Sequence, residues 1–338
     1  LRPDAADTLA YFAAQGVTVR VVSGDSAATV SAVAAQVGLP RAAEPVDARS
    51  WPDDPEALDT LIASHTVFGR VTPEQKRAMV DSLRRQGHVI AMTGDGVNDT
   101  LALKDADLGI AMGSGSPVTR GVAQLVLLND QFETLPSVVA EGRQVLHNIE
   151  RVSSLFLVKN TYSLIISVVV AIAGWPYPFL PRHLSLISAV AIGIPGFFLA
   201  LSPSEERFRP GFLRRTLRFS VTAGTITSAA VLSTYAIGRQ QSAPGVEART
   251  GAVIVLTFVS LWVLALAARP WQLWKAALIL AMAGLFIAAF TVPGVKTFFN
   301  LEHPPNALIT FEAVVIGAIA CVLISVATRV VEARARAS

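Results

Sequence analysis

The residues best suited to chemistry lie in one short run, residues 92–99, which reads Met-Thr-Gly-Asp-Gly-Val-Asn-Asp. Asp95, Asn98 and Asp99 supply clustered oxygen ligands of the hard type that Mg²⁺ prefers when it also contacts a phosphate. A solvated turn rich in Asp and Asn would have the same composition. The choice between these two interpretations depends on the elements around the run.

The run lies between a predicted strand and a predicted helix. Residues 87–91 are mostly apolar and predict a buried parallel strand, and a helix is predicted to begin near Thr100. A turn that opens a helix favours anions, because its N–H groups are unpaired and the helix dipole is positive there. Gly94 and Gly96 would let the backbone approach a ligand closely. These features favour a metal and phosphate site.

Two other polar turns follow predicted strands. Val17–Val22 is rich in β-branched residues and ends in Ser23-Gly24-Asp25, and a helix is predicted from Ala27 to Val37. Residues 65–71 predict a second strand, after which Thr72 as N-cap and Pro73 in the first turn open another helix. Lys76, just inside that helix, could reach a phosphate bound at neighbouring strand ends.

The alternation of strands and helices predicts an α/β doubly wound fold with a parallel sheet. Further strands are predicted at residues 108–112 and 125–128, whereas residues 40–60 predict a surface excursion. All three polar turns would then lie at the carboxyl edge of the sheet, which is where open α/β sheets bind ligands.

Composition separates the chain into two parts. Its 338 residues are 52% hydrophobic and 16% charged, with a formal net charge of +3, but the long apolar runs all lie beyond about residue 150. Basic residues lie between these runs rather than along one face, which argues against a nucleic-acid partner. The single cysteine, Cys321, lies inside an apolar run and excludes both a disulfide framework and a Cys-based metal site.

In order and spacing, the polar motifs resemble the phosphorylation domain of P-type ATPases, which are cation pumps of the haloacid-dehalogenase superfamily. The matching segments are Ser23-Gly24-Asp25, Arg70-Val71-Thr72-Pro73-Glu74-Gln75-Lys76, Thr93-Gly94-Asp95-Gly96-Val97-Asn98-Asp99 and Asp105-Ala106-Asp107-Leu108-Gly109-Ile110-Ala111-Met112. The resemblance is nearest to a bacterial branch known as cation-transporting ATPase E. It implies a partial phosphorylation domain over residues 1–145 and a transmembrane domain over residues 146–338.

The resemblance implies a role for each matching residue. Ser23 would hydrogen-bond the transferred phosphoryl group, and Lys76 would neutralise its charge. Asp95 would hold Mg²⁺, and Asn98 and Asp99 would complete the site, with Asp99 as the second metal ligand. The residues implied to bind the cofactor are Ser23, Gly24, Asp25, Lys76 and Gly94. Mg²⁺ and ATP are the expected cofactors, because phosphoryl transfer depends mostly on positioning and charge neutralisation.

The chain also departs from the family pattern. The family's phosphorylated aspartate stands in an Asp-Lys-Thr-Gly-Thr run, and no such run occurs in this sequence. The nucleotide-binding domain, the dephosphorylation loop and the first four membrane helices are missing as well. We therefore expect the C-terminal half of an ATP-driven cation transporter, inactive by itself, whose partner is the missing N-terminal half.

Two other functions remain open. A non-catalytic relic or membrane partner protein that retains a phosphate- and Mg²⁺-binding fold would explain the absent nucleophile, although the intact Ser23, Lys76, Asp95 and Asp99 argue against long decay. A membrane-anchored phosphatase would need its own nucleophilic aspartate after a strand. Asp25 is the nearest candidate, but its Ser-Gly-Asp setting fits a phosphoryl-binding turn better.

Six apolar runs are each close to the roughly 20 residues needed to cross a lipid bilayer. They cover residues 152–173, 184–202, 219–237, 251–268, 273–292 and 309–328. An even number of spans puts both ends on one side, and ATP puts that side in the cytoplasm, across a bacterial plasma membrane. The positive-inside rule agrees. Segments expected inside carry Arg207, Arg209, Arg214, Arg215, Arg218, Arg269, Lys275, Arg329, Arg334 and Arg336, against Arg182, Arg239, Arg249 and Lys296 outside.

Ligands for the transported ion are expected in the first two spans. Asn160 and Ser163 are polar residues of the first span, and polar groups inside a membrane indicate function. The run Gly193–Gly196, which contains Pro195, predicts a break in the second span that would free carbonyls near Ser188 and Ile194. A tolerated proline kink would explain the same run. The resemblance favours calcium, yet carboxylates are scarce at these positions, so the ion stays open.

Overall fold

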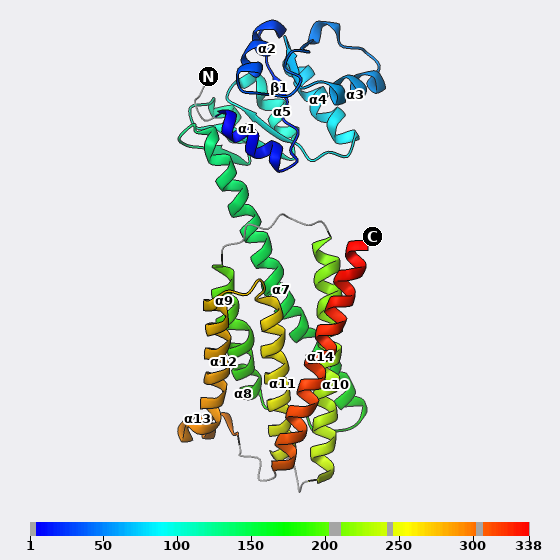
Figure 1. Ribbon diagram of the computed structural model, residues 1–338, viewed down its shortest axis with the longest axis vertical. Helices are drawn as coiled ribbons and strands as arrows, with labels where there is room; N and C mark the ends of the chain where they lie inside the picture. Colours follow the sequence, from blue (N-terminus) through cyan, green and yellow to red (C-terminus); the bar gives the residue numbers. More distant parts are fainter. Residues whose placement is uncertain (1–4, 203–210, 242–245, 302–306, 338) are drawn as a thin grey trace. The chain divides into compact units, whose positions relative to one another are not determined.

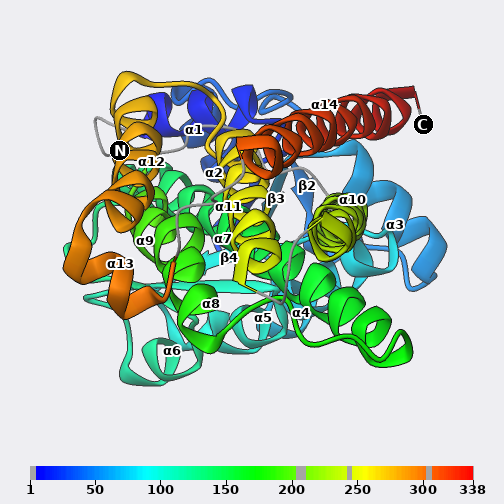
Figure 2. The same ribbon diagram turned by 90° about the horizontal axis from the view of Figure 1, so that it is seen from below.

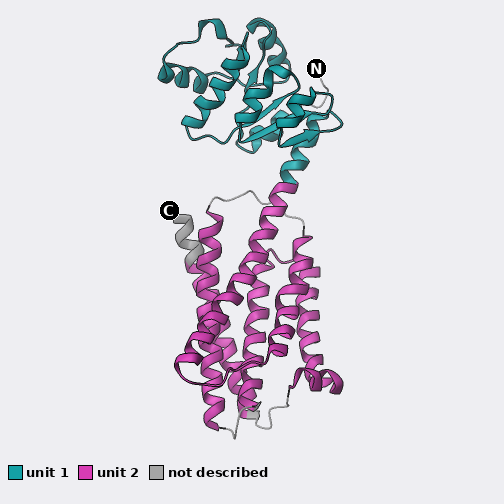
Figure 3. Cartoon of the chain, turned by 180° about the vertical axis from the view of Figure 1, so that it is seen from behind, with its two compact units in different colours: residues 1–140 teal, residues 141–338 magenta. Residues whose placement is uncertain are grey.

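The computed structural model describes residues 5–202, 211–241, 246–301 and 307–337. The chain divides into two compact units, Leu1–Ala140 and Glu141–Ser338 (Figure 3). Arg207 and Arg209, two basic residues that entered the topology prediction, lie outside the described residues.

The first unit alternates short parallel strands with helices (Figure 1). Its strands are β1 Val21–Val22, β2 Val46–Asp47, β3 Val67–Gly69, β4 Ala91–Gly94, β5 Leu108–Met112 and β6 Leu125–Leu127. Its α-helices are α1 Ala5–Ala14, α2 Ala27–Gln36, α3 Pro55–Ser64, α4 Pro73–Arg85, α5 Thr100–Asp105 and α6 Pro117–Val122. Short 3-10 turns complete it at η1 Ala48–Ser50, η2 Val97–Asp99 and η3 Phe132–Thr134. The α/β class predicted from the sequence is confirmed.

The strands form two sheets where the sequence predicted one. Each sheet has three parallel strands, in the orders β1-β3-β2 and β4-β5-β6. Among the described strands, β1 and β4 each have a neighbour on one side only. Val22 of β1 and Met92 of β4 nevertheless pack against one hydrophobic cluster, which includes Ile62, Phe68 and Val80. Two open strand edges therefore border a common core.

Other predictions for this unit were also wrong, and the strand expected over Val17–Val22 forms only at Val21–Val22. The strand expected at residues 87–91 begins only at Ala91, and Val89 is 89% exposed. Apolar composition indicated burial, but a strand at an open edge lacks the neighbour that would cover the residues before it. Residues 40–60 are more than a surface excursion, because they include β2, η1 and the start of α3. The Asp and Pro residues there start helices, as at Asp54, whose carboxylate accepts the N–H of Ala57 at 2.9 Å.

The second unit is helical, and six helices of the described chain are long and apolar enough to cross a membrane, as predicted. They are α7 Leu135–Ile172, the composite helix Pro181–Ala200, α10 Phe212–Gln241, α11 Val246–Ala267, α12 Leu273–Thr291 and α14 Ala307–Ala337. A shorter helix, α13 Pro293–Phe299, follows α12. Helices α10, α11 and α14 pack against one another (Figure 2).

The second span is continuous, so the predicted break at residues 193–196 was wrong. Helix α8, Pro181–Ser188, passes into a π-helical segment η4, Ala189–Gly193, and then into α9, Ile194–Ala200. The N–H of Ile194 reaches back five residues to the carbonyl of Ala189. Pro195 lies in the first turn of α9, where a proline is tolerated. The five-residue hydrogen bonding of the π turn before it keeps the helix continuous.

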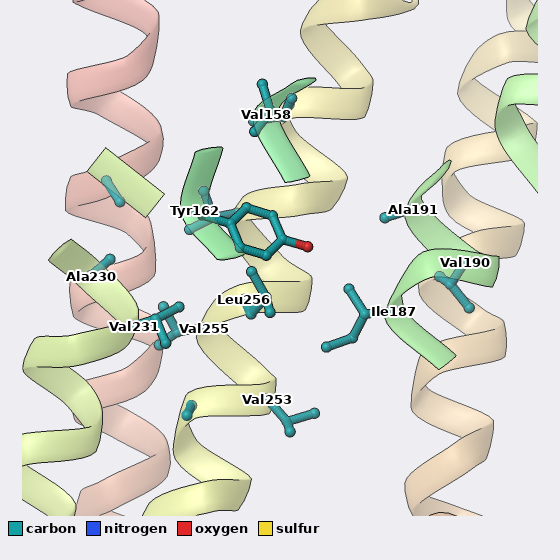
Figure 4. Close-up of a cluster of buried hydrophobic side chains, with 14 of the residues drawn as sticks. Val158, Tyr162, Ile187, Val190, Ala191, Ala230, Val231, Val253, Val255 and Leu256 are labelled. Atoms are coloured by element: carbon teal, nitrogen blue, oxygen red, sulfur yellow. The ribbon is translucent and has the colours of Figure 1, made fainter. Parts of the chain in front are cut away.

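Small residues let the membrane helices approach closely. A Cβ added at Gly224 of α10 would lie 2.5 Å from Cβ of Thr161 on α7, and one at Gly238 would lie 2.9 Å from Cα of Ala248 on α11. Packing of this kind replaces the hydrophobic effect as the source of helix association in lipid. Figure 4 shows Tyr162 among apolar side chains, including Ile187 and Leu256.

Candidate functional site

The first polar turn connects β1 to α2. Ser23 is half-buried, and its hydroxyl accepts the N–H of Asp25 at 3.1 Å and lies 3.1 Å from the Asp25 carboxylate. Ser26 caps α2, because its hydroxyl oxygen accepts the N–H of Thr29 at 3.2 Å. The turn thus combines a hydroxyl with the N-terminal end of a ten-residue helix, which suits an anion.

The end of β3 is joined to this turn by the backbone. The N–H of Val71 donates to the carbonyl of Ser23 at 3.0 Å, and the N–H of Arg70 donates to the carbonyl of Asp25 at 2.7 Å. Gly69 makes the approach possible, since a Cβ there would lie 2.4 Å from the backbone of Ala27. The first and second polar turns are therefore one structural feature.

Helix α4 begins directly after this junction and brings Lys76 to the third motif. Thr72 and Gln75 form the capping box that sets the helix start. Lys76 Nζ lies 2.6 Å from Asp99 Oδ1, and the two side chains are only 11% and 12% exposed. Lys76 and Asp99 are 23 residues apart in sequence. The start of α4 is thus bonded to the first motif, through Val71 and Ser23, and to the third motif, through Lys76 and Asp99.

The turn after β4 is held by its own glycine. A Cβ on Gly94 would lie 2.6–2.8 Å from the Asp99 side chain, so only glycine leaves room for that carboxylate. Asp95 and Asn98 are exposed, and within the described chain no protein group hydrogen-bonds the Asp95 carboxylate. Asp95 is therefore available to a ligand, whereas Asp99 is engaged by Lys76.

Ser116 and Thr119 also support this turn, although neither was predicted from the sequence to belong to the site. The N–H of Ser116 donates to the carbonyl of Asp95 at 2.9 Å, and the buried Thr119 hydroxyl donates to the carbonyl of Gly96 at 2.9 Å. Ser116 also caps α6, with Pro117 in its first turn. That Ser-Pro start, directly after the Gly-Ser turn, was the available signal.

The donor chemistry fits Mg²⁺, although the described residues contain no cluster of three or more His, Cys, Asp or Glu side chains. Mg²⁺ in phosphate sites is commonly held by one or two carboxylates, with water and phosphate oxygens filling the rest of its shell. Asp95 and Asp99, four residues apart on one turn, supply that number. Lys76, beside Asp99, adds a positive charge for a phosphate.

A second charged group lies at the carboxyl end of β2. Asp47 pairs with Arg49 at 2.8 Å and with Arg70 at 3.1 Å. Hydrogen bonds from Arg49 lower the pKa of the Asp47 carboxyl to about 2. Arg70 therefore contacts both polar strand ends of this sheet, through its backbone at Asp25 and its guanidinium at Asp47.

The residues expected to bind the transported ion lie on the first two spans and differ in exposure. Asn160 is exposed on α7, Ser163 and Ser188 are half-buried, and Ile194 is 37% exposed. The hydroxyl of the buried Tyr162, by contrast, points toward Ile187 and the η4 segment (Figure 4).

Comparisons with known proteins agree with both units. A family model described as a haloacid dehalogenase-like hydrolase matches residues 1–107. The chain is 46% identical over 96% of its length to the calcium-transporting ATPase CtpE of Mycolicibacterium smegmatis, and 46% identical over 94% to that of Mycobacterium tuberculosis. It is 33% identical over 89% of its length to the probable cation-transporting ATPase exp7 of Streptococcus pneumoniae. These matches cover 43%, 41% and 40% of the relatives, so the chain spans about two fifths of their length.

Proposed function

From the membership of this chain in the P-type ATPases, which its homology to cation-transporting members over most of its length establishes, we infer that it forms the C-terminal half of an ATP-driven cation pump. The pump would work through an aspartyl phosphate, and the phosphorylated Asp, the nucleotide-binding domain and the first four membrane helices would come from a complementary N-terminal half. The observation that carries the proposal is that the start of α4 is bonded to both motifs, at Ser23 through Val71 and at Asp99 through Lys76.

The two open strand edges support a complementary segment. A single parallel strand inserted between β1 and β4 would join the sheets in the order β2-β3-β1, new strand, β4-β5-β6. Val22 and Met92 already border one core, so the inserted strand would bury side chains against it. Its carboxyl end would lie between the turns that carry Ser23 and Asp95. A nucleophilic aspartate is expected at that end.

The chain's own residues would then act by binding and charge neutralisation. The Ser23 hydroxyl would donate a hydrogen bond to a phosphoryl oxygen, and Lys76 would neutralise charge as the aspartate oxygen bonds to phosphorus and the bond to ADP breaks. Asp95 and Asp99 would hold Mg²⁺, which supplies further neutralisation when bound. Gly24 and the Asp25 turn would leave space for the nucleotide phosphates, Gly94 would let the Asp99 carboxylate lie close to the backbone that faces the cofactor, and Asn98 would complete the metal site.

The transported ion is proposed to bind between the first two spans. Asn160, Ser163, Ser188 and the carbonyl of Ile194 remain the candidate ligands. The π-helical segment supports this assignment, because Pro195 has no N–H and leaves a preceding carbonyl without its helical donor. Calcium is the favoured ion, since two relatives are calcium-transporting ATPases. The pump would lie in the bacterial plasma membrane with both ends in the cytoplasm.

A second function is favoured by one observation, the absence of an Asp-Lys-Thr-Gly-Thr run from the sequence. On that basis the chain would be a non-catalytic relic or a membrane partner protein that retains a phosphate- and Mg²⁺-binding fold. The two functions differ in whether ATP labels a protein that contains this chain.

Acid-gel detection of phosphoenzyme tests the proposal. Native membranes are given ATP labelled at the γ-phosphate, and the protein is captured with an antibody against this chain. Acid-stable, hydroxylamine-sensitive label in the captured material, either in a band well above 35.8 kDa or in a co-captured partner, is expected for a working pump. Captured protein with no label in any band would contradict the pump and leave the relic or partner protein.

A further inference from the structure

Three residues of α7 reach three other segments of the second unit within one turn of helix. These residues are Asn148, Glu150 and Arg151. Asn148 bonds the end of α9, Glu150 bonds the start of α10 through Arg215, and Arg151 bonds the α11–α12 connection through the carbonyl of Arg269. The ends of these helices are therefore fixed to α7 at one level.

Asn148 completes the end of α9. The last carbonyls of a helix lack partners within the helix. In α9, the N–H of Leu201 bonds the carbonyl of Phe198 at 3.2 Å, and the N–H of Ser202 bonds that of Leu199 at 3.1 Å. The carbonyl of Ala200 instead accepts Asn148 Nδ2 at 2.5 Å, and that of Ser202 lies 3.4 Å from the same nitrogen.

Arg151 sets the orientation of the Asn148 amide. Its Nη1 donates to Asn148 Oδ1 at 3.3 Å, and its Nη2 donates to the carbonyl of Arg269 at 3.2 Å. With the oxygen occupied by Arg151, the amide nitrogen faces α9. Asn148 is 6% exposed, so few alternative partners in water compete for it.

The contact reaches the π-helical segment through α9. Ala200 lies seven residues after Gly193, which is about 10 Å along a helix at 1.5 Å per residue. π-helical turns are rare and occur mostly as single turns inside α-helices, frequently at functional sites. An anchor at the end of α9 is therefore close enough along the helix to bear on the position of the η4 carbonyls.

We propose that Asn148 is a positioning residue that sets the conformation of the π-helical segment by holding the end of α9 against α7. The proposal rests on the proposed function only in making that segment part of the ion site. Glu150 and Arg215, which bond at 3.2 and 3.3 Å, join α7 to α10.

Hydrogen–deuterium exchange of the full chain in lipid nanodiscs tests this. Asn148→Asp keeps an oxygen that Arg151 can bond, and it replaces the amide N–H donor by a carboxylate oxygen that cannot donate to the carbonyl of Ala200. Loss of one hydrogen bond of this kind should raise exchange about tenfold in peptides covering residues 189–202, and leave peptides of α10 and α14 unchanged. Asn148→Gln, which retains the donor, should restore most of the protection. The control is Ser154→Ala, a buried site whose hydroxyl bonds only its own helix, at the carbonyl of Glu150.

Two results would overturn the proposal. One is unchanged exchange in residues 189–202 of Asn148→Asp, and the other is faster exchange across all helices alike, which would mean general destabilisation. The proposed function is tested separately by adding Ca²⁺ to the unsubstituted chain. No protection of residues 189–194 by Ca²⁺ would count against the assigned ion site while leaving the result for Asn148 intact.

Discussion

Removing the charge of Lys76 alone should destabilise the first unit more than removing both charges of its ion pair. At the 2.6 Å separation of Lys76 Nζ and Asp99 Oδ1, Coulomb attraction is about 6 kcal/mol at an effective dielectric constant of about 20, before the opposing cost of desolvation. Deleting one partner of a buried pair costs about 3–5 kcal/mol because the other charge stays buried and unpaired. The side chains are still 11% and 12% exposed, and this remaining contact with water lowers the cost of an unpaired charge toward the lower end of that range. We expect a loss of about 3 kcal/mol for Lys76→Met and about 1 kcal/mol for Lys76→Met combined with Asp99→Asn.

Urea-dependent pulse proteolysis of the full chain in detergent, read from an N-terminal tag, measures the stability of the first unit. The control cycle uses Arg77 and Asp105, whose side chains lie 2.5 Å apart but are 53% and 23% exposed. That exposed pair should contribute less than about 1 kcal/mol. Additive losses in the Lys76–Asp99 cycle, or equal losses in both cycles, would refute the reasoning that burial makes the pair important.

Three further predictions follow from other parts of the chain. Gly69→Ala should cost about 1–3 kcal/mol by the same assay, because its Cβ would meet the backbone of α2 at 2.4 Å, whereas Gly24→Ala, with nothing within 4 Å, should cost far less. Hydrogen bonds from Arg49 hold the pKa of Asp47 at about 2, so its contribution to stability should be complete above about pH 4 and be lost as the pH falls toward 2. Asp47→Asn should make the urea midpoint of unfolding depend less on pH across that window. In the complete pump, Ile149→Pro should uncouple ATP turnover from transport by breaking the continuous helix α7, and unchanged coupling would exclude α7 as the transmitting element.

Features set by local sequence were the ones that could be predicted. The start of α4 follows from Thr72, Pro73 and Gln75 alone, and the structure has the capping box that this spacing indicates. The membrane spans follow in the same way from runs of apolar residues. Both signals depend on residues that are neighbours along the chain.

Features that depend on distant partners were missed. The sequence suggested that Lys76 would reach a phosphate, but nothing near Lys76 indicates Asp99 as its neighbour. Support of Gly96 by Thr119, 23 residues later, is equally non-local. The π-helical segment was mistaken for a break because Pro195 disrupts either arrangement, and only the packed helix shows which one forms. The catalytic and ion-binding roles of the residues stay predictions, since position alone does not test them.

Both units expose residues of a kind that is normally covered. In the first, Val89 precedes the open edge of β4 and is 89% exposed. In the second, Asn160 is exposed on a stretch of α7 that also carries the exposed Phe156 and Leu164, at 48% and 66%. Lipid alone would suit the two apolar residues, but an amide at that depth needs a polar partner. Val89 would be covered by an added strand, and Asn160 would be paired by an added membrane helix. A complementary half that contains both elements would supply both partners. A relic without such a half would leave both kinds of residue uncovered, and this difference is the physical reason to favour the pump.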